Sequence, residues 1–175
     1  MRRQNLSAFI EGALMIGIAT ILSFIKVFQA PYGGSVTLGS MVPIILYSVR
    51  HGAAKGVLAG TVYGLLQLVI EPYIVHPAQV ILDYPLAFGL LGLAGLFGGR
   101  IYLGIPAGIL GRFLSHLLSG VIFFASYAPE GMNALVYSAI YNGSYLLPEL
   151  VISLLAVRFV LYRFIRKNEG SGDSG

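Results

Sequence analysis

Long apolar runs divide this chain into segments of the length that a membrane-spanning helix requires. Such a helix needs about 20 mainly apolar residues to cross the hydrocarbon core. Six segments satisfy this pattern, although the second is short: residues 6–28, 36–49, 53–70, 79–98, 103–126 and 134–162. Proline and glycine punctuate the connections at 31–34, 71–77 and 128–131. The pattern predicts an all-α integral membrane protein with a six-helix transmembrane bundle.

The composition supports a membrane protein and excludes several kinds of site. Of the 175 residues 57% are hydrophobic and 10% are charged, whereas about a quarter of the residues in soluble domains are charged. No cysteine is present, which excludes disulfides, thiolate metal sites and cysteine nucleophiles. We expect no metal centre and no cofactor. Residues 1–167 are expected to form a single membrane domain, and residues 168–175 a flexible, Gly- and Ser-rich tail typical of an expression remnant.

The basic residues occupy alternate connections between the predicted helices. One set of connections and ends carries Arg2, Arg3, Arg50, Lys55, Arg100, Arg158, Arg163, Arg166 and Lys167. The opposite set carries Glu71 and Glu130 and, apart from Lys26, almost no basic residue. By the positive-inside rule both termini are therefore expected to be cytoplasmic, in a plasma-membrane protein with three outer loops. The net charge of +4 is then a topology signal in a lipid bilayer, and nucleic acid is not expected as a partner.

Small residues four positions apart lie on one face of two predicted helices. The third helix carries Gly56, Gly60 and Gly64, and the first carries Ala13 and Gly17. Such a face lets another helix backbone approach closely. Packing within the bundle is the favoured explanation of either set, and docking of another membrane protein is the alternative.

Four ionisable residues interrupt the apolar segments: Asp83, Arg112, His116 and Glu149. Charged groups inside a bilayer are costly, so each is a candidate for function. At a rise of 1.5 Å per residue, Asp83 is expected about 6 Å below the outer end of its helix and Arg112 near mid-membrane. His116 follows one turn further out, on the same helical face as Arg112.

Aromatic and polar residues are expected to join these groups in the outer half of the bundle. The last helix carries two neighbouring stripes of such residues: Tyr137, Tyr141 and Ser144 on one, and Asn142 and Tyr145 on the other. Tyr73 from the connection after the third helix and Tyr84 from the fourth helix join them. One carboxylate, several hydrogen-bond donors and many aromatic faces suit a small, partly aromatic, cationic ligand.

Structural explanations compete with this interpretation. Asp83 and Arg112 can neutralise each other as a buried ion pair, and His116 can serve as an interhelical hydrogen bonder. The tyrosines can form an aromatic belt at the membrane interface. Glu149 is expected to cap backbone groups freed by Pro148 and to stay out of contact with the ligand.

Catalysis is the competing class of function. Ser115, His116 and Asp83 could be combined as a triad, but the sequence has neither a GxSxG elbow nor an HExxH pair. We therefore do not expect an enzyme.

A series of short motifs follows the order seen in one known family. From the first loop to the last helix they are Gly33-Gly34-Ser35-Val36, Met41-Val42-Pro43-Ile44, Arg50-His51-Gly52, His76-Pro77-Ala78-Gln79, Leu82-Asp83-Tyr84, Arg112 with His116, Ser119 and Gly120, Phe123-Phe124, Tyr127-Ala128-Pro129, Gly131, Tyr137-Ser138 and Tyr141-Asn142. Together they resemble the thiamine-specific S-components of energy-coupling factor (ECF) transporters, the ThiT/YuaJ family. The resemblance covers nearly all of the chain except the tail.

The resemblance implies a six-helix subunit that binds thiamine tightly, in a pocket open to the outer side, without chemistry on the ligand. Transport would need an ECF transmembrane coupling protein and two cytoplasmic ATPase subunits, in keeping with the absence of a GxxxxGK(S/T) motif here. The implied ligand-binding residues are Asp83, Tyr84, His116, Phe124, Tyr137, Asn142, Tyr73 and Arg112. The small-residue face with Ala13 and Gly17 is implied to meet the coupling protein.

The chain departs from well-known members of the family at several pocket positions. They carry glutamate in place of Asp83 and lysine in place of Arg112. They also have two pocket tryptophans, whereas this chain has none; Phe124 matches one of these positions, and the other falls near Gly34. Two alternatives stay open: a binder of a thiamine precursor such as hydroxymethylpyrimidine and, from another class of function, a self-sufficient secondary transporter.

Overall fold

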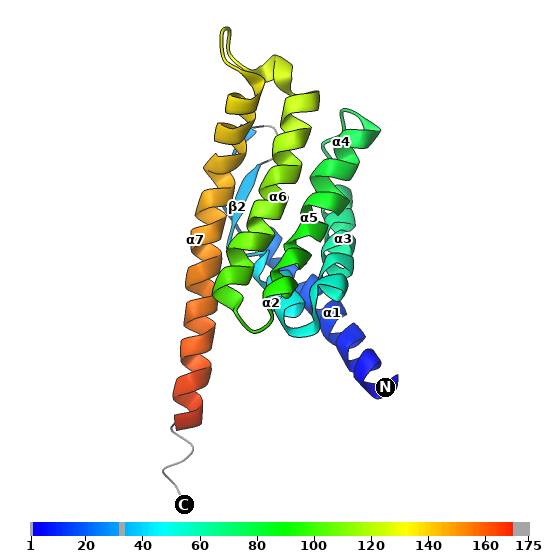
Figure 1. The fold of residues 1–175 in the computed structure, drawn as a ribbon, viewed down its shortest axis with the longest axis vertical. Helices are drawn as coiled ribbons and strands as arrows, with labels where there is room; N and C mark the ends of the chain where they lie inside the picture. Colours follow the sequence, from blue (N-terminus) through cyan, green and yellow to red (C-terminus); the bar gives the residue numbers. More distant parts are fainter. Residues whose placement is uncertain (1, 32–33, 170–175) are drawn as a thin grey trace, which may run out of the picture.

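The computed structural model describes the backbone of residues 2–31 and 34–169, which form a helical bundle with one small hairpin (Figure 1). The helices are α1 (Arg2–Ser23), α2 (Val42–His51), α3 (Ala53–Ile70), α4 (Pro77–Ile81), α5 (Ala87–Gly89), α6 (Ile101–Phe123) and α7 (Ala134–Glu169). The beginning of α1 and the end of α7 lie at the same end of the bundle (Figure 1). Gly33 and positions 170–175 of the expected tail lie outside the described residues.

Residues 77–97 form one helical column built from four short pieces. α4 is followed by a π-helical turn at Leu82–Leu86, by α5 and by a 3₁₀ stretch at Leu90–Phe97. Pro85 lies inside the π-helical turn and has no N–H to donate, so the ordinary α-helical ladder is interrupted there. The carbonyl of Leu82 accepts a hydrogen bond from Ser115 Oγ at 2.6 Å, which ties this turn to α6.

The predicted six-helix bundle is confirmed when residues 77–97 are counted as one helix. Among the described residues, five helices are long and apolar enough to cross a membrane: Leu6–Ser23, Ala53–Ile70, Pro77–Phe97, Ile101–Phe123 and Ala134–Phe159. The remaining helix, α2, has 10 residues and a length of about 15 Å, which is half of a typical hydrocarbon core.

A β-hairpin replaces parts of the first two predicted helices. Strand β1 (Lys26–Gln29) pairs antiparallel with β2 (Ser35–Thr37), with Lys26 opposite Thr37 and Gln29 opposite Ser35. The expected helices over 6–28 and 36–49 are wrong at 24–28 and at 36–41, because α1 ends at Ser23 and α2 begins only at Val42. Short apolar runs such as those around Val27 fit a strand as well as a helix, and the proline and glycines at 31–34 favour a reversal of the chain between two strands.

Glycines bring α3 into close contact with the column at 77–97. A Cβ at Gly60 would lie 2.2 Å from the Phe88 carbonyl oxygen, and one at Gly64 would lie 2.4 Å from the Tyr84 carbonyl oxygen. From the other side, a Cβ at Gly92 would lie 2.3 Å from the Val57 nitrogen. The small residues of α3 therefore serve packing within the bundle, as the first of the two interpretations expected.

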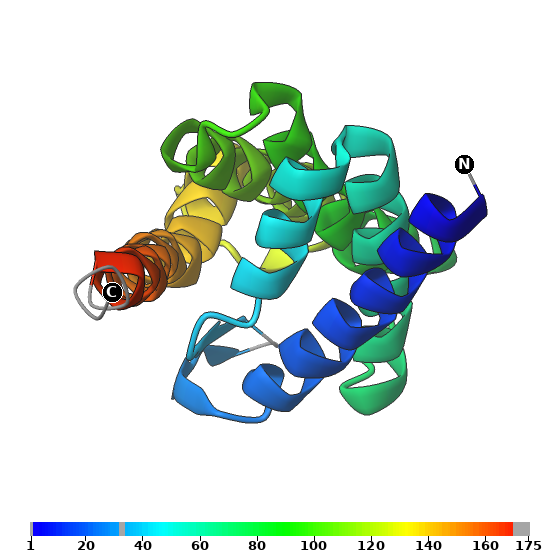
Figure 2. The same cartoon turned by 90° about the horizontal axis from the view of Figure 1, so that it is seen from below.

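The hydrophobic core surrounds α2, which lies in the middle of the bundle when it is seen along its axis (Figure 2). Met41, Ile44 and Ile45 are fully buried, and they meet Leu91 and Ile105 from the neighbouring helices. By contrast, many outward-facing Leu, Ile, Val and Phe side chains are more than half exposed, the distribution expected of a bundle whose outer surface meets lipid.

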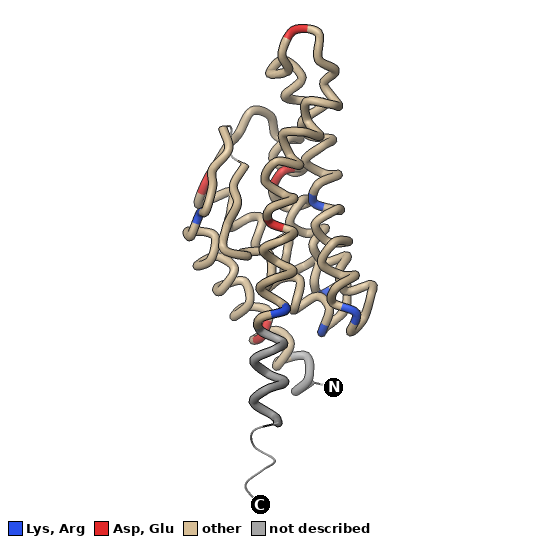
Figure 3. The backbone as a smooth tube through the Cα atoms, turned by 90° about the vertical axis from the view of Figure 1, so that its left-hand side faces the viewer, with Lys and Arg blue, Asp and Glu red and all other residues tan. Residues whose placement is uncertain are grey.

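Most basic residues of the described part of the chain lie toward the end of the bundle where α1 begins and α7 ends (Figure 3). Arg50, Lys55 and Arg100 lie in or beside the short connections at this end. The segregation of charge predicted from the sequence is thus present in three dimensions.

Candidate functional site

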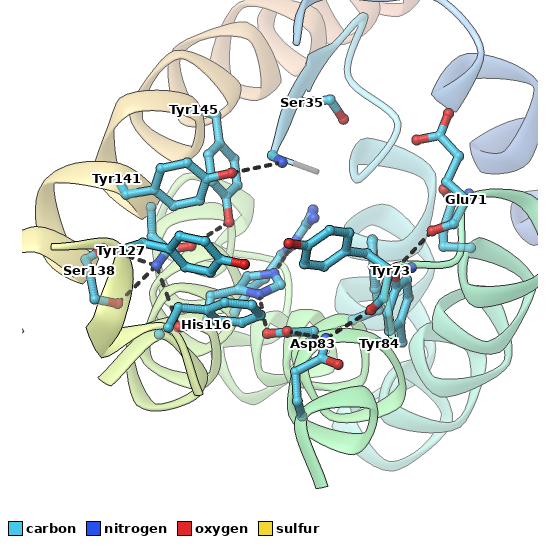
Figure 4. A pocket seen from close by; sticks show the side chains of 18 of the residues that line it. Ser35, Glu71, Tyr73, Asp83, Tyr84, His116, Tyr127, Ser138, Tyr141 and Tyr145 are labelled. Carbon is cyan, nitrogen blue, oxygen red and sulfur yellow. Dashed lines mark hydrogen bonds and ion pairs between the residues drawn. The ribbon is translucent and has the colours of Figure 1, made fainter. Parts of the chain in front are cut away.

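A cavity of about 570 Å³ opens in the half of the bundle remote from the chain termini (Figure 4). Its wall combines the second half of α6, the first half of α7, the end of α3, the segment from Glu71 to Phe88 and the hairpin. This volume lies in the range of pockets for small organic ligands.

All eight residues expected to bind ligand line this one cavity: Asp83, Tyr84, His116, Phe124, Tyr137, Asn142, Tyr73 and Arg112. Tyr141 and Tyr145, which the sequence placed in the same polar cluster, also line it. Gln79, which was not expected among the site residues, also lines the cavity. Its spacing of four residues from Asp83 on a helix was the available signal.

Asp83 holds one hydrogen bond on each carboxylate oxygen. Oδ1 lies 3.0 Å from His116 Nδ1, and Oδ2 accepts from Gln79 Nε2 at 2.7 Å. The alternative that Asp83 forms an ion pair with Arg112 is therefore wrong: its partner on α6 is His116. The carboxylate bridges the π-helical turn and α6 at the floor of the cavity.

Arg112 donates a hydrogen bond to the His116 ring, and this contact identifies the ring nitrogen that carries the proton. Its Nε–H donates to His116 Nε2 at 3.2 Å, so Nε2 is an acceptor and the proton lies on Nδ1, where it is donated to Asp83. The rest of the guanidinium packs 4.1 Å from the centre of the Phe88 ring and donates through Nη1 to the Met41 sulfur at 3.0 Å. His116 is thus both an interhelical hydrogen bonder and a cavity residue.

Aromatic rings form two groups in the wall of the cavity. In one group Phe124 lies 6.0 Å from the ring of Tyr73 and stacks on Tyr127 at 5.8 Å. In the other group Tyr141 stacks on Tyr137 at 6.3 Å and meets Tyr145 edge-on at 5.8 Å. The tyrosines of α7 line the cavity, and Tyr145 is only 3% exposed, which argues against the aromatic-belt interpretation for that residue.

The position near Gly34 has no room for a larger side chain. A Cβ on Gly34 would lie 2.6 Å from the ring carbons of Tyr145. The Gly34 N–H donates to the Tyr141 hydroxyl at 3.2 Å, and that hydroxyl in turn donates to the Pro31 carbonyl. Two tyrosines of α7 therefore occupy the space beside this loop and hold its backbone.

Asn142 is buried at the inner wall. Its Oδ1 accepts from the Tyr145 hydroxyl at 2.5 Å, and its Nδ2 donates to the Ser138 carbonyl at 2.9 Å. On the opposite wall, the Tyr84 hydroxyl donates to the Glu71 carbonyl and accepts from the Tyr73 N–H, both at 2.8 Å. These hydrogen bonds fix side chains of the wall before a ligand enters.

Glu149 has a different role from the one expected. Its Oε1 accepts from the Thr37 hydroxyl at 2.6 Å and from the Thr37 N–H, so the backbone that it satisfies belongs to β2 and not to its own helix beside Pro148. It is only 1% exposed and does not line the cavity. Glu149 therefore anchors the hairpin to α7.

Ser115, His116 and Asp83 do not form a catalytic triad. Ser115 Oγ donates to the Leu82 carbonyl, while both nitrogens of His116 are engaged by Asp83 and Arg112. Within the described residues, no group of three His, Cys, Asp or Glu side chains could hold a metal ion.

Ala13 and Gly17 of α1 face outward. Ala13 and Gly17 are exposed, and a Cβ at Gly17 would have no atom within 4 Å. Large apolar side chains surround them on the same surface, including Phe9 and Leu14, which are 73% and 62% exposed. Unlike the glycines of α3, these residues do not serve packing within this chain.

Comparison with known proteins gives matches over nearly the whole chain. A family model described as "Thiamine transporter protein (Thia_YuaJ)" matches residues 9–169. The thiamine transporter ThiT of Bacillus subtilis strain 168 is 33% identical over 173 residues, covering 88% of this chain and 90% of that protein. ThiT of Lacticaseibacillus paracasei is 29% identical over 180 residues, covering 91% and 89%. The solved structure of ThiT from Listeria monocytogenes matches with a TM-score of 0.82 and 26% identity, covering 91% of this chain and 96% of that one.

Proposed function

The chain belongs to the thiamine transporter (Thia_YuaJ) family, and from this premise we propose that it is the thiamine-binding, substrate-specificity subunit of an ECF-type vitamin transporter. Family membership and five apolar helices make it a multi-pass membrane protein whose role is transport and not catalysis. In this proposal the chain captures thiamine tightly and leaves it chemically unchanged.

The negative charge of Asp83 inside an aromatic-walled cavity carries the proposal. Thiamine joins a permanently cationic thiazolium to a neutral aminopyrimidine. In a site of low dielectric, an opposed carboxylate stabilises the cation strongly, whereas an unpaired charge is costly. Asp83 would face the thiazolium, because its two hydrogen-bond partners, Gln79 and the neutral His116, leave its charge in place.

The aromatic and polar walls suit the other ring of the vitamin. The aminopyrimidine would stack on Phe124, whose ring already packs against Tyr73 and Tyr127. His116, Tyr137 and Asn142, all in the wall of the cavity, would supply polar contacts to it. The Tyr84 hydroxyl would hold the backbone at Tyr73 in place by accepting the hydrogen bond from the Tyr73 N–H. Arg112 would fix the ring of His116 through its hydrogen bond to Nε2.

The cavity would open to the outside of the cell. It lies in the half of the bundle remote from both chain termini, and the basic residues gather at the opposite end. The positive-inside rule assigns that basic end to the cytoplasm. Thiamine would then be bound from the outer side, with both termini in the cytoplasm.

The exposed face of α1 would dock the transmembrane coupling protein. Ala13 and Gly17 leave a shallow surface against which a second helix can pack closely. Two cytoplasmic ATPase subunits would supply the energy, since this sequence has no phosphate-binding loop of the GxxxxGK(S/T) type.

Calorimetric titration of thiamine into the purified protein in detergent tests the ligand. We expect tight binding at a ratio of one to one. Hydroxymethylpyrimidine, which lacks the cation, should compete only at much higher concentration. Equal competition by this fragment would replace thiamine with its precursor as the ligand, and no binding of thiamine by folded protein would overturn the proposal.

Uptake into vesicles tests the need for partners. Vesicles that contain this chain alone should bind thiamine but should not accumulate it, with or without an ion gradient. Addition of the coupling protein and both ATPases should give uptake that depends on ATP. Accumulation driven by an ion gradient alone would instead support a self-sufficient secondary transporter.

A further inference from the structure

Gln79 is a fully buried polar residue at the start of the column that carries Asp83. It lies on α4, one helical turn before Asp83, and is only 1% exposed. Few side chains of its size are buried so completely in this protein, and nearly all of the others are apolar or aromatic. Burial of an amide is costly unless its hydrogen bonds are made, so its partners indicate what it does.

The Gln79 amide is held in one orientation by three hydrogen bonds. Nε2 donates to Asp83 Oδ2 at 2.7 Å and to the Tyr73 carbonyl at 3.1 Å. Oε1 accepts from the Val75 N–H at 3.1 Å. A flipped amide would set an acceptor against the carboxylate and against the carbonyl, and a donor against the N–H, so only one orientation satisfies all three partners.

Asp83 lies on an irregular part of the helical column, and two side chains fix its carboxylate. Asp83 lies in the π-helical turn that contains Pro85, where the regular α-helical ladder is interrupted. Its carboxylate has one hydrogen-bond donor on each oxygen, Gln79 and His116. The carboxylate plane is thereby held, and each oxygen keeps acceptor capacity toward the cavity.

The chemical nature of the donor matters as much as its position. A lysine or arginine in the place of Gln79 would pair with Asp83 and cancel its charge toward a ligand. An amide donates the same hydrogen bond and remains neutral. Gln79 can therefore hold the carboxylate while preserving its negative charge for a cation.

From this geometry we propose that Gln79 is a positioning residue for charge selectivity: it aims Asp83 at the cationic part of the ligand and so makes the cavity prefer a cation over a neutral molecule of the same shape. The inference rests on the proposed function, in which Asp83 faces the thiazolium of thiamine. Gln79 acts through Asp83 and through the segment at Tyr73, without itself touching the cation.

The preference for charge is measured with two ligands of nearly identical shape. One is thiamine, and the other is its neutral analogue in which a thiophene replaces the thiazolium. Gln79→Met keeps the length of the side chain and removes all three hydrogen bonds. It should weaken thiamine binding about tenfold or more, because the carboxylate loses its fixed direction. Binding of the neutral analogue should weaken less than about threefold, since no charge pairing is lost.

Gln67 offers a matched control. It is another glutamine in the cavity wall, but its amide donates to Ser23 Oγ at 3.0 Å and makes no hydrogen bond to Asp83. Gln67→Met should change the affinity for both ligands by a similar factor, leaving the preference for thiamine within about twofold of the wild-type value.

A double-mutant cycle separates a positioning role from a merely structural one. In the Asp83→Asn background, Gln79→Met should cost less than about twofold in thiamine affinity, because the charge through which it acts is gone. The same loss in both backgrounds would overturn the inference, and so would equal losses for the two ligands.

A shorter amide provides a second variant in case Gln79→Met does not fold. Gln79→Asn retains the polar group but lacks the methylene needed to reach Asp83 and the Tyr73 carbonyl together. It should show the same reduced preference for thiamine, and an unchanged preference would overturn the inference. Failure of the wild-type protein to bind thiamine would overturn the proposed function itself, whereas normal wild-type binding with unaltered Gln79 variants would overturn only this inference.

Discussion

Asp83 is a carboxylate whose two hydrogen-bond donors are neutral and belong to different helices, α4 and α6. Together they fix the group without cancelling its charge. The guanidinium of Arg112 on α6 does not pair with Asp83. It donates a hydrogen bond to the Met41 sulfur and packs on the Phe88 ring. The arrangement keeps a negative charge available inside a bundle where most of the surroundings are apolar.

Removal of this charge should weaken ligand binding directly. We expect Asp83→Asn to reduce thiamine affinity at least tenfold, about 1.4 kcal/mol, as measured by calorimetric titration. Glu149→Gln is the matched control, because it neutralises a buried carboxyl group that does not line the cavity. Unchanged affinity in Asp83→Asn would exclude Asp83 as the partner of the cation.

Glu149 should matter for stability and not for recognition. Glu149→Ala leaves the Thr37 N–H and hydroxyl without their acceptor and should destabilise the protein by about 2–4 kcal/mol. Glu149→Gln keeps an oxygen for these donors and should cost less than about 1 kcal/mol. Thermal unfolding in detergent measures both, and equal midpoints for the two variants would show that the Thr37 contact contributes little.

The sequence indicated most of the individual site residues but not their partners. Helical spacing placed Arg112 and His116 on one face, and the cost of charge in a bilayer singled out Asp83 and Glu149. Pairing depends on contacts between distant segments: Glu149 and Thr37 are 112 residues apart. Spacing along one helix carries no information about such a contact, which is why the role of Glu149 emerged only from the structure.

At the scale of the elements, similar small-residue patterns have different surroundings. The glycines of α3 bring backbones together, whereas Gly17 on α1 has open space around its Cβ position. A pattern of residues four apart identifies a face but does not say what covers it. The structure assigns the α3 face to the interior and leaves the α1 face exposed.

Alanine substitutions should separate the two glycine sets. Gly60→Ala would place a methyl group against the Phe88 backbone and should lower the unfolding midpoint in detergent strongly, since backbone cannot move aside cheaply. Gly17→Ala adds a methyl group in open space and should leave the midpoint unchanged or slightly raised, because alanine favours a helix by about 1 kcal/mol. Similar effects of both substitutions would contradict the assignment of α3 to internal packing.

The hairpin shows where hydropathy fails as a guide to structure. Apolar residues continue past Ser23 through Val27 and Phe28, and a hydropathy pattern extends the helix accordingly. The chain instead forms β1, pairs it with β2, and leaves only 10 residues for α2. Apolar character predicts that a segment is suited to a membrane, and it does not by itself distinguish a helix from a strand in a short run.

For the whole molecule, the distribution of charge predicts an orientation in the membrane. The chain has no cysteine, so a single introduced cysteine can be labelled without background. Glu130→Cys, in the connection between α6 and α7, should react with an impermeant maleimide in intact cells. Lys55→Cys, at the start of α3 near the opposite end, should react only after the cells are opened. The reverse pattern would place the cavity on the cytoplasmic side.

The distribution of aromatic residues gives the protein a particular optical property. It has 11 tyrosines and no tryptophan, and six of these tyrosines lie around the cavity: Tyr73, Tyr84, Tyr127, Tyr137, Tyr141 and Tyr145. Its intrinsic ultraviolet fluorescence therefore comes from tyrosine alone, and much of it arises within contact distance of a bound molecule. An aromatic ligand that enters the cavity is expected to quench this emission, so the unlabelled protein can report its own occupancy.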